Sequence, residues 1–170
     1  MIEDFFRLLM DALLFYPLLL LPSMLFPPIV SAALTALTLQ QCEPLVATLH
    51  FLRDVLAYGT PNPPSSSTST SLSTPAPHQP ARNPPEIQQL VRKVILSEGE
   101  TLVQRILTGM MFSFPRDCFP DASGVLLGLV ELCPGEVSGW IARTVGMLPQ
   151  GTVSRTEMER LIGGVEEYVS

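Results

Sequence analysis

The chain has 170 residues, with 16 Asp and Glu against 10 Lys and Arg and a net charge of -6 at pH 7. This length accommodates one compact domain or a short array of helical units, and it excludes a TIM barrel. The acidic balance excludes a broad basic surface for nucleic acid, because Arg92, Lys93 and Arg105 are few and dispersed. An acidic surface suits a basic protein partner instead.

The first 41 residues predict two helices. An amphipathic pattern over 2–16 ends before Pro17, and a Leu- and Pro-rich loop then leads to a second helix that begins near Pro27 or Pro28 and ends at about Gln41. The apolar residues of this first pair exceed what one neighbouring pair can cover, so we expect the isolated chain to self-associate. These residues are Phe5, Phe6, Leu9, Leu13, Leu14 and Phe15.

Residues 12–41 contain no charged side chain and are long enough to cross a membrane. However, four prolines divide the run into pieces that are each too short to span a bilayer. They are Pro17, Pro22, Pro27 and Pro28. We therefore expect packed helices here, and a small membrane-anchored protein built on residues 12–41 is the less favoured alternative.

A third helix is predicted from Glu43 and Pro44 to residue 58, with Gly59 as its stop. The segment 60–84 that follows is rich in Ser, Thr and Pro and contains no aromatic residue, so it cannot bury enough apolar surface to order itself. We predict that 60–84 is a disordered surface insertion whose deletion leaves stability nearly unchanged.

Helical periodicity resumes over 86–112, where two apolar faces flank a weak point at Ser97–Gly99. Residues 120–133 are apolar on nearly all sides, which predicts a buried central helix. Residues 136–148 predict a helix in which Trp140 packs between neighbouring helices.

A last helix is predicted to open with Ser154 and Glu157 as a capping box. Its apolar positions are Met158, Leu161, Ile162 and Val165. No stretch shows the sustained alternation of a strand, so the predicted fold is all-α.

Once the insertion is set aside, the helices recur at roughly forty residues, which is the period of a HEAT-type repeat. The predicted pairs are 2–16 with 27–41, 43–58 with 86–112, and 120–133 with 136–148. The predicted organisation is a helical-repeat (α-α superhelix) fragment. Residues 1–59 form helical repeats, 60–84 the disordered insertion, and 85–170 the remaining repeats and the terminal helix.

The side chains that carry catalysis or bind metals are few. His50 has no Cys, Asp or Glu at metal-ligand spacing, and His78 falls in the low-complexity segment. The odd set of cysteines, Cys42, Cys118 and Cys133, also lacks such spacing, and we predict buried free thiols.

Three acidic residues lie near predicted helix ends, where solvation or capping is a simpler role than acid/base catalysis. They are Asp121, Glu131 and Glu136. Gly124 and Gly128 form a G-x-x-x-G pattern that favours close helix packing. We therefore assign no catalytic, cofactor-binding or metal-ligating residue, and we expect a protein that is not an enzyme and needs no cofactor.

Several short segments occur in a fixed order: DFFRLL, FLRDVLAYG, LVQRIL, FSFP, FPD, VLLGLVEL, GWIARTVGMLP and TEMERLI. This order resembles the C-terminal portion of importin-β-type nuclear transport receptors, in the transportin-SR branch whose fungal relatives are mRNA transport regulators. The most specific points are Phe51, Leu52, Arg53 and Asp54, and Trp140 with the later Leu148 and Pro149.

The resemblance implies a HEAT-repeat superhelix that moves between nucleus and cytoplasm. It implies protein cargo, such as SR-rich or RNA-binding proteins, and release of that cargo by Ran-GTP in the full-length receptor. It carries over no binding residue, because the arginine-rich cargo-reading helix of the family finds no clear match here. An unrelated helical-repeat adaptor is the alternative reading.

Overall fold

The computed structural model describes residues 1–64 and 82–149, and single positions or short runs from 151 to 167. Its helical elements are α1 (Ile2–Phe15), α2 (Pro17–Leu20), α3 (Phe26–Ala36), α4 (Cys42–Tyr58), α5 (Pro85–Phe112), the 3-10 turn η1 (Arg116–Cys118), α6 (Phe119–Leu132) and α7 (Pro134–Gly146). No strand occurs among these residues, which confirms the all-α prediction. His78, Glu157 and the apolar positions predicted for the last helix lie outside the described residues.

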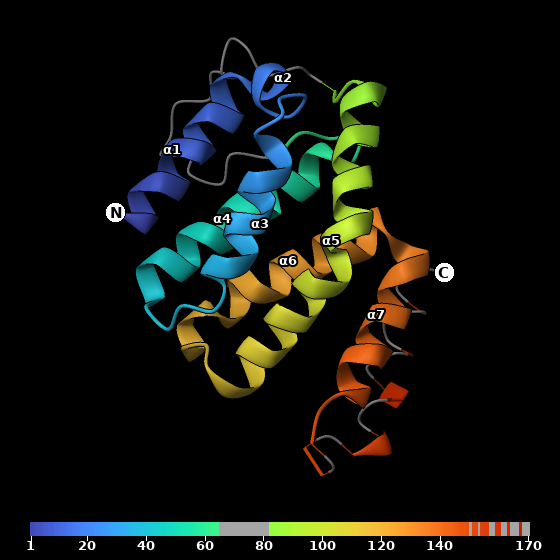
Figure 1. Ribbon diagram of the computed structural model, residues 1–170. Coiled ribbons are helices and arrows are strands. Elements are labelled where there is room, and N and C mark those ends of the chain that lie inside the picture. The colour runs from blue at the N-terminus through green and yellow to red at the C-terminus, as the bar shows by residue number, and fades with distance from the viewer. Residues whose placement is uncertain are drawn as a thin grey trace.

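The helices are stacked in two rows (Figure 1). In one row α1 packs on α4 and α4 on α6, and in the other α3 packs on α5 and α5 on α7. The pairs α4–α5 and α6–α7 join the rows, as expected for consecutive helical repeats. The predicted pairing of α1 with α3 is wrong as a main contact, because α1 packs chiefly on α4.

The Leu- and Pro-rich loop and the end of α3 differ from the sequence prediction. The loop contains a short helix, α2, with Pro17 in its first turn. Helix α3 ends at Ala36 rather than at Gln41, because the chain tightens into i to i-3 bonds. The Thr38 amide and hydroxyl both donate to the Thr35 carbonyl, at 3.0 and 2.7 Å.

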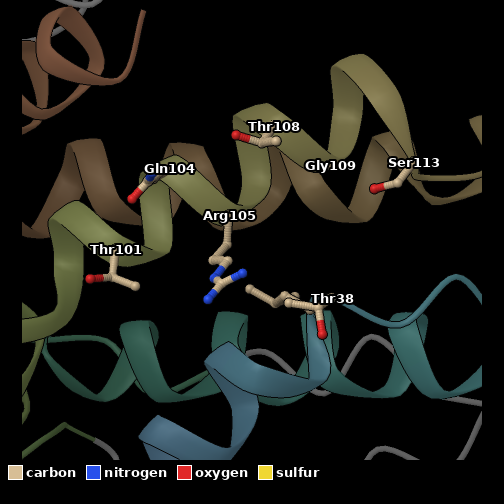
Figure 2. Close-up of a pocket in the computed structure, with 8 residues that line it drawn as sticks. Thr38, Thr101, Gln104, Arg105, Thr108, Gly109 and Ser113 are labelled. Atoms are coloured by element: carbon tan, nitrogen blue, oxygen red, sulfur yellow. The ribbon is translucent and has the colours of Figure 1, made fainter. Parts of the chain in front are cut away.

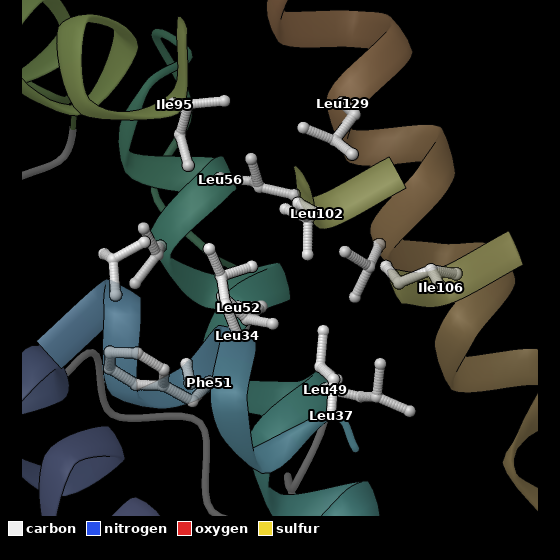
Figure 3. Packing of buried hydrophobic residues seen from close by; sticks show 14 of the residues in the cluster. Leu34, Leu37, Leu49, Phe51, Leu52, Leu56, Ile95, Leu102, Ile106 and Leu129 are labelled. Carbon is white, nitrogen blue, oxygen red and sulfur yellow. The ribbon is translucent and has the colours of Figure 1, made fainter. Parts of the chain in front are cut away.

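Helix α4 occupies the centre of the core, in contact with α1, α3, α5 and α6 (Figure 3). Its fully buried Leu49, Leu52 and Leu56 pack among the apolar side chains of these neighbours. The prediction that residues 120–133 form the buried central helix is therefore wrong. Helix α6 ends its row within the described chain, and its Leu127 is 45% exposed.

Close approach between α4 and α6 depends on one glycine of the G-x-x-x-G pattern. A Cβ at Gly128 would lie 3.1 Å from Leu56 Cδ1, whereas a Cβ at Gly124 would lie 3.8 Å from Arg53 Cδ, which is an ordinary contact. The close helix packing predicted from this pattern is therefore confirmed at Gly128 but not at Gly124.

Helix α5 is continuous over the predicted weak point, but its axis changes direction near the middle (Figure 1). There the Ser97 hydroxyl donates to the Val94 carbonyl at 2.8 Å. Two residues later, Gly99 lies against the ring of Trp140 from α7, where a Cβ would overlap the indole. Trp140 is only 6% exposed, which confirms that it packs between helices.

The ends of the Ser/Thr/Pro segment are ordered, so the prediction of disorder over all of 60–84 is wrong for its edges. Asn83 is buried, and its side-chain amide donates to the carbonyls of Ala57 and Thr60 at 3.0 and 2.7 Å. Its own backbone amide donates to the Pro61 carbonyl at 3.0 Å. Residues 65–81 lie outside the described part of the chain.

Candidate functional site

A polar groove of about 330 Å³ lies between α5 and the turn that follows α3 (Figure 2). Arg105 extends from α5 towards Thr38, and the hydroxyls of Thr101 and Thr108 line the same groove. Among the described residues, no carboxylate lies within ion-pair distance of Arg105. One guanidinium among hydroxyl groups can bind a single carboxylate or phosphate group by donating hydrogen bonds to it.

A second groove, of about 360 Å³, lies beside the C-terminal half of α4 and has both acidic and basic lining residues. It is lined by Arg53, Asp54 and Glu131, together with residues that follow α4. Burial raises the pKa of Asp54, and the charges of Arg53 and His50 oppose that rise. Arg53 Nε lies 3.8 Å from Asp54 Oδ1, so a basic side chain that enters the groove would share this carboxylate with Arg53.

A third groove, of about 820 Å³, is formed by the start of α1 and the turn between α3 and α4. It is lined by Glu3 and Glu43 and by residues 38–41. Helix α1, which contributes to this groove, also carries exposed apolar side chains. Phe5, Leu8 and Phe15 are 45%, 66% and 42% exposed, respectively.

Further exposed apolar side chains are Leu18 and Leu19 of α2 and Met24 and Leu25 of the turn after it, and we call them, together with Phe5, Leu8 and Phe15, the α1–α2 face. The sequence predicted an excess of apolar surface here, but it named some of the wrong residues. Phe6, Leu9 and Leu13 are buried on the opposite side of α1. Exposed large apolar side chains on two consecutive helices are typical of a surface that another protein segment covers.

Two titratable residues that the sequence analysis singled out separately, His50 and Asp121, lie side by side in the structure. His50 Nε2 lies 2.8 Å from Asp121 Oδ1, which joins α4 to the first turn of α6. Sequence spacing could not reveal this pair, because the two residues lie 71 positions apart. Glu131 is exposed, and Glu136 lies in the first turn of α7.

The cysteines are free, with Cys118 and Cys133 buried and Cys42 half-buried. Cys42 Sγ and Cys118 Sγ are 3.3 Å apart, a proximity that the sequence analysis missed. Cys133 lies elsewhere, and burial raises its pKa to about 11, with Glu136 adding to the rise and Arg92 opposing it. Within the described residues, no three His, Cys, Asp or Glu side chains are grouped to hold a metal ion.

The uncharged run 12–41 is divided among the end of α1, α2 and α3. No helix in the described part of the chain has the length and apolar character needed to cross a membrane.

Comparison with known proteins gives three relatives that align with nearly the whole chain. An uncharacterised protein of Schizosaccharomyces pombe is 33% identical over 171 residues, which is 98% of this chain and 17% of the relative. The mRNA transport regulator MTR10 of Saccharomyces cerevisiae is 25% identical over 176 residues, 98% of this chain and 17% of that protein. Transportin MOS14 of Arabidopsis thaliana is 19% identical over 165 residues, 97% of this chain and 15% of that protein.

The chain therefore spans about a sixth of the length of the curated relatives that it matches. No family model matches it. At these identities the similarity to a transportin and to an mRNA transport regulator supports a relationship to importin-β-type proteins only loosely. The two-row helical stack agrees with that relationship, because successive helix pairs are the building unit of a helical-repeat protein.

Proposed function

We propose that this chain is the C-terminal part of an importin-β-type nuclear import receptor and that it acts as a non-catalytic protein-binding scaffold. The observation that carries the proposal is the similarity to a transportin and an mRNA transport regulator over 97–98% of the chain. The similarity includes both sides of the Ser/Thr/Pro segment, so it involves the helices that form the two rows.

The cargo we propose is a basic protein, such as an SR-rich or RNA-binding protein. The net charge of -6 favours encounter with a basic partner, and the Asp54 groove offers a place for one of its cationic side chains. The complete receptor would shuttle between nucleus and cytoplasm and release its cargo on binding Ran-GTP.

A chimaera tests this proposal in a living cell. The segment of the yeast mRNA transport regulator that aligns with this chain is replaced by the chain, and nuclear accumulation of the regulator's cargo is measured. We expect import to be retained, because the replaced segment would supply the same stacked helices. A chimaera that carries an unrelated helical-repeat segment of equal length is the matched control, and it should lose import.

The chimaera must be shown to be expressed and folded before import is scored, by its level in the cell and its helical signal after purification. A folded chimaera that leaves the cargo in the cytoplasm would contradict the proposal. That result would favour the alternative, a helical-repeat adaptor with no role in nuclear transport.

A further inference from the structure

Two thiols from distant parts of the sequence meet at the junction of successive helices. Cys42 is the first residue of α4, and Cys118 is the last residue of η1, directly before α6. Their sulfur atoms are 3.3 Å apart although 76 positions separate them in the chain. The two sulfurs are therefore already neighbours and need to move only a short distance to reach the disulfide bond length of about 2.05 Å.

The two thiols differ in access. Cys118 is fully buried, whereas Cys42 is half-buried and can be reached from solvent. Burial raises the pKa of Cys118 to about 12, and the adjacent Cys42 and the charges of Asp121 and Asp117 add to the rise. An oxidant from solvent therefore reacts with Cys42 first, whereas Cys118 stays a protonated thiol next to it.

We propose that Cys42 and Cys118 form a reversible disulfide when the protein meets a peroxide. The Cys42 thiolate attacks one oxygen of the peroxide, the O–O bond breaks, and hydroxide leaves and takes up a proton as water. Cys42 is then a sulfenic acid. The Cys118 sulfur attacks it, the S–O bond breaks as the S–S bond forms, and the Cys118 proton leaves with the hydroxyl group as a second water.

The bond joins the start of α4 to the turn before α6 and so ties two successive helices of one row. In the reduced protein this junction is held by apolar packing and by the His50–Asp121 pair. A covalent tie at the same place fixes the spacing of α4 and α6, and it closes a long loop in the unfolded chain. The disulfide therefore stiffens the helical stack and raises its stability, and thiol reductants reverse both effects.

The test is oxidation of the full chain with hydrogen peroxide, followed by blocking of the remaining thiols and peptide mass spectrometry. Trypsin alone leaves Cys118 and Cys133 on one peptide, between Arg116 and Arg143. Additional cleavage after Glu131 separates them, so the partner of Cys42 is identified directly. We expect a Cys42–Cys118 peptide within a monomeric chain, close to one per molecule, that dithiothreitol removes.

Variants separate this pair from general thiol oxidation. Cys42→Ser and Cys118→Ala should each abolish the crosslinked peptide, and Cys133→Ala, the matched control, should leave its yield unchanged. Helical signal before oxidation shows that each variant is folded. The oxidised wild-type chain should melt on the order of 5–15 °C above the reduced chain.

Three results would overturn the proposal. They are a disulfide that involves Cys133, a bond between two chains in place of the internal one, or Cys42 oxidised to sulfinic acid with Cys118 still a thiol. A Cys42–Cys118 bond without a rise in melting temperature would overturn the proposed stiffening of the stack.

Discussion

The α1–α2 face and the contact between α5 and α7 use apolar side chains in opposite ways. On α1, Phe5 and Leu8 point outwards and are 45% and 66% exposed. At the α5–α7 contact, Trp140 is nearly buried against Gly99. At the rim of that contact, Arg143 donates two hydrogen bonds to the Glu100 carboxylate, at 2.6 and 3.0 Å.

The difference shows which surfaces the described chain completes by itself. The α5–α7 contact has an apolar centre and a charged rim, which is the usual arrangement of a protein interface whose two sides are both present. On the α1–α2 face the apolar side chains stay exposed among the described residues. We infer that the described chain completes the α5–α7 contact, whereas α1 presents a surface that another segment can cover.

The largest expected effect comes from breaking the α5–α7 contact at Trp140. Trp140→Ala should reduce the free energy of unfolding by about 3–5 kcal/mol, because it leaves a cavity between the two helices. The chain has a single Trp, so fluorescence reports this site before any substitution is made. A red-shifted, freely quenched emission from the folded protein would contradict the burial of Trp140.

Gly99→Ala tests the same contact from the other helix. The added methyl group overlaps the indole of Trp140, so we expect a loss of about 1–3 kcal/mol in spite of the higher helix propensity of Ala. Gly135→Ala in α7 is the matched control, because nothing lies within 4 Å of its added Cβ. Chemical denaturation should show the control to be as stable as the wild type or more so. Equal stability of the two variants would exclude close packing at Gly99.

The third effect concerns the start of α5. Asn83→Ala should cost about 1–3 kcal/mol, because the buried amide of Asn83 no longer donates to the Thr60 carbonyl or to the Ala57 carbonyl, although the latter keeps its bonds from Thr60. Deleting residues 60–84 should cost at least as much, contrary to the stability expected from composition alone. Thermal melting measures both, and Asn62→Ala, an exposed position in the same segment, is the control. Wild-type stability after the deletion would show that the Asn83 contacts contribute nothing.

The features that could be predicted from the sequence are those that depend on residues close together in the chain. Helix positions followed from apolar periodicity and from prolines in first turns. The packing role of Trp140 followed from the helical face it shares with other apolar residues, and that of Gly128 from the G-x-x-x-G pattern. Pairs such as His50–Asp121 and Cys42–Cys118 were out of reach, because each joins α4 to a segment more than seventy residues later.

The role of Asn83 was missed for a different reason. Composition averages over a whole segment, and one buried amide at the edge of a Ser/Thr/Pro run does not change that average. The same limit explains the error about residues 120–133. Their apolar composition predicted burial on all sides, but α6 lies at the end of its row among the described helices, with Leu127 exposed.

The fourth prediction concerns self-association through the α1–α2 face. We expect the purified chain to associate at low micromolar concentration. Leu8→Lys places a charge in the apolar face, so the protein concentration at which half of the chains are associated should rise at least about tenfold. Leu127→Lys makes the same change of charge at an exposed Leu of α6 and should have little effect. Light scattering over a dilution series measures both. A monomer that unfolds cooperatively would instead show that the chain is a self-capped helical domain.

The smallest effect is the pH dependence of the Glu100–Arg143 pair. The hydrogen bond from Arg143 lowers the pKa of Glu100, burial opposes that change, and the charge of Arg143 lowers the pKa further. A carboxyl group whose pKa is lower in the folded state than in the unfolded state stabilises the fold above the unfolded value, and this contribution is lost as the pH falls through the folded value. Between neutral pH and about pH 3, the melting temperature of the wild type should therefore fall slightly more than that of Glu100→Gln. The melting temperature of Glu98→Gln, a change on the same helix but outside the pair, should fall as much as that of the wild type.

High salt should reduce the difference between the wild type and Glu100→Gln, because the pair is exposed. A difference that persists at about 1 M salt would show that another group causes it.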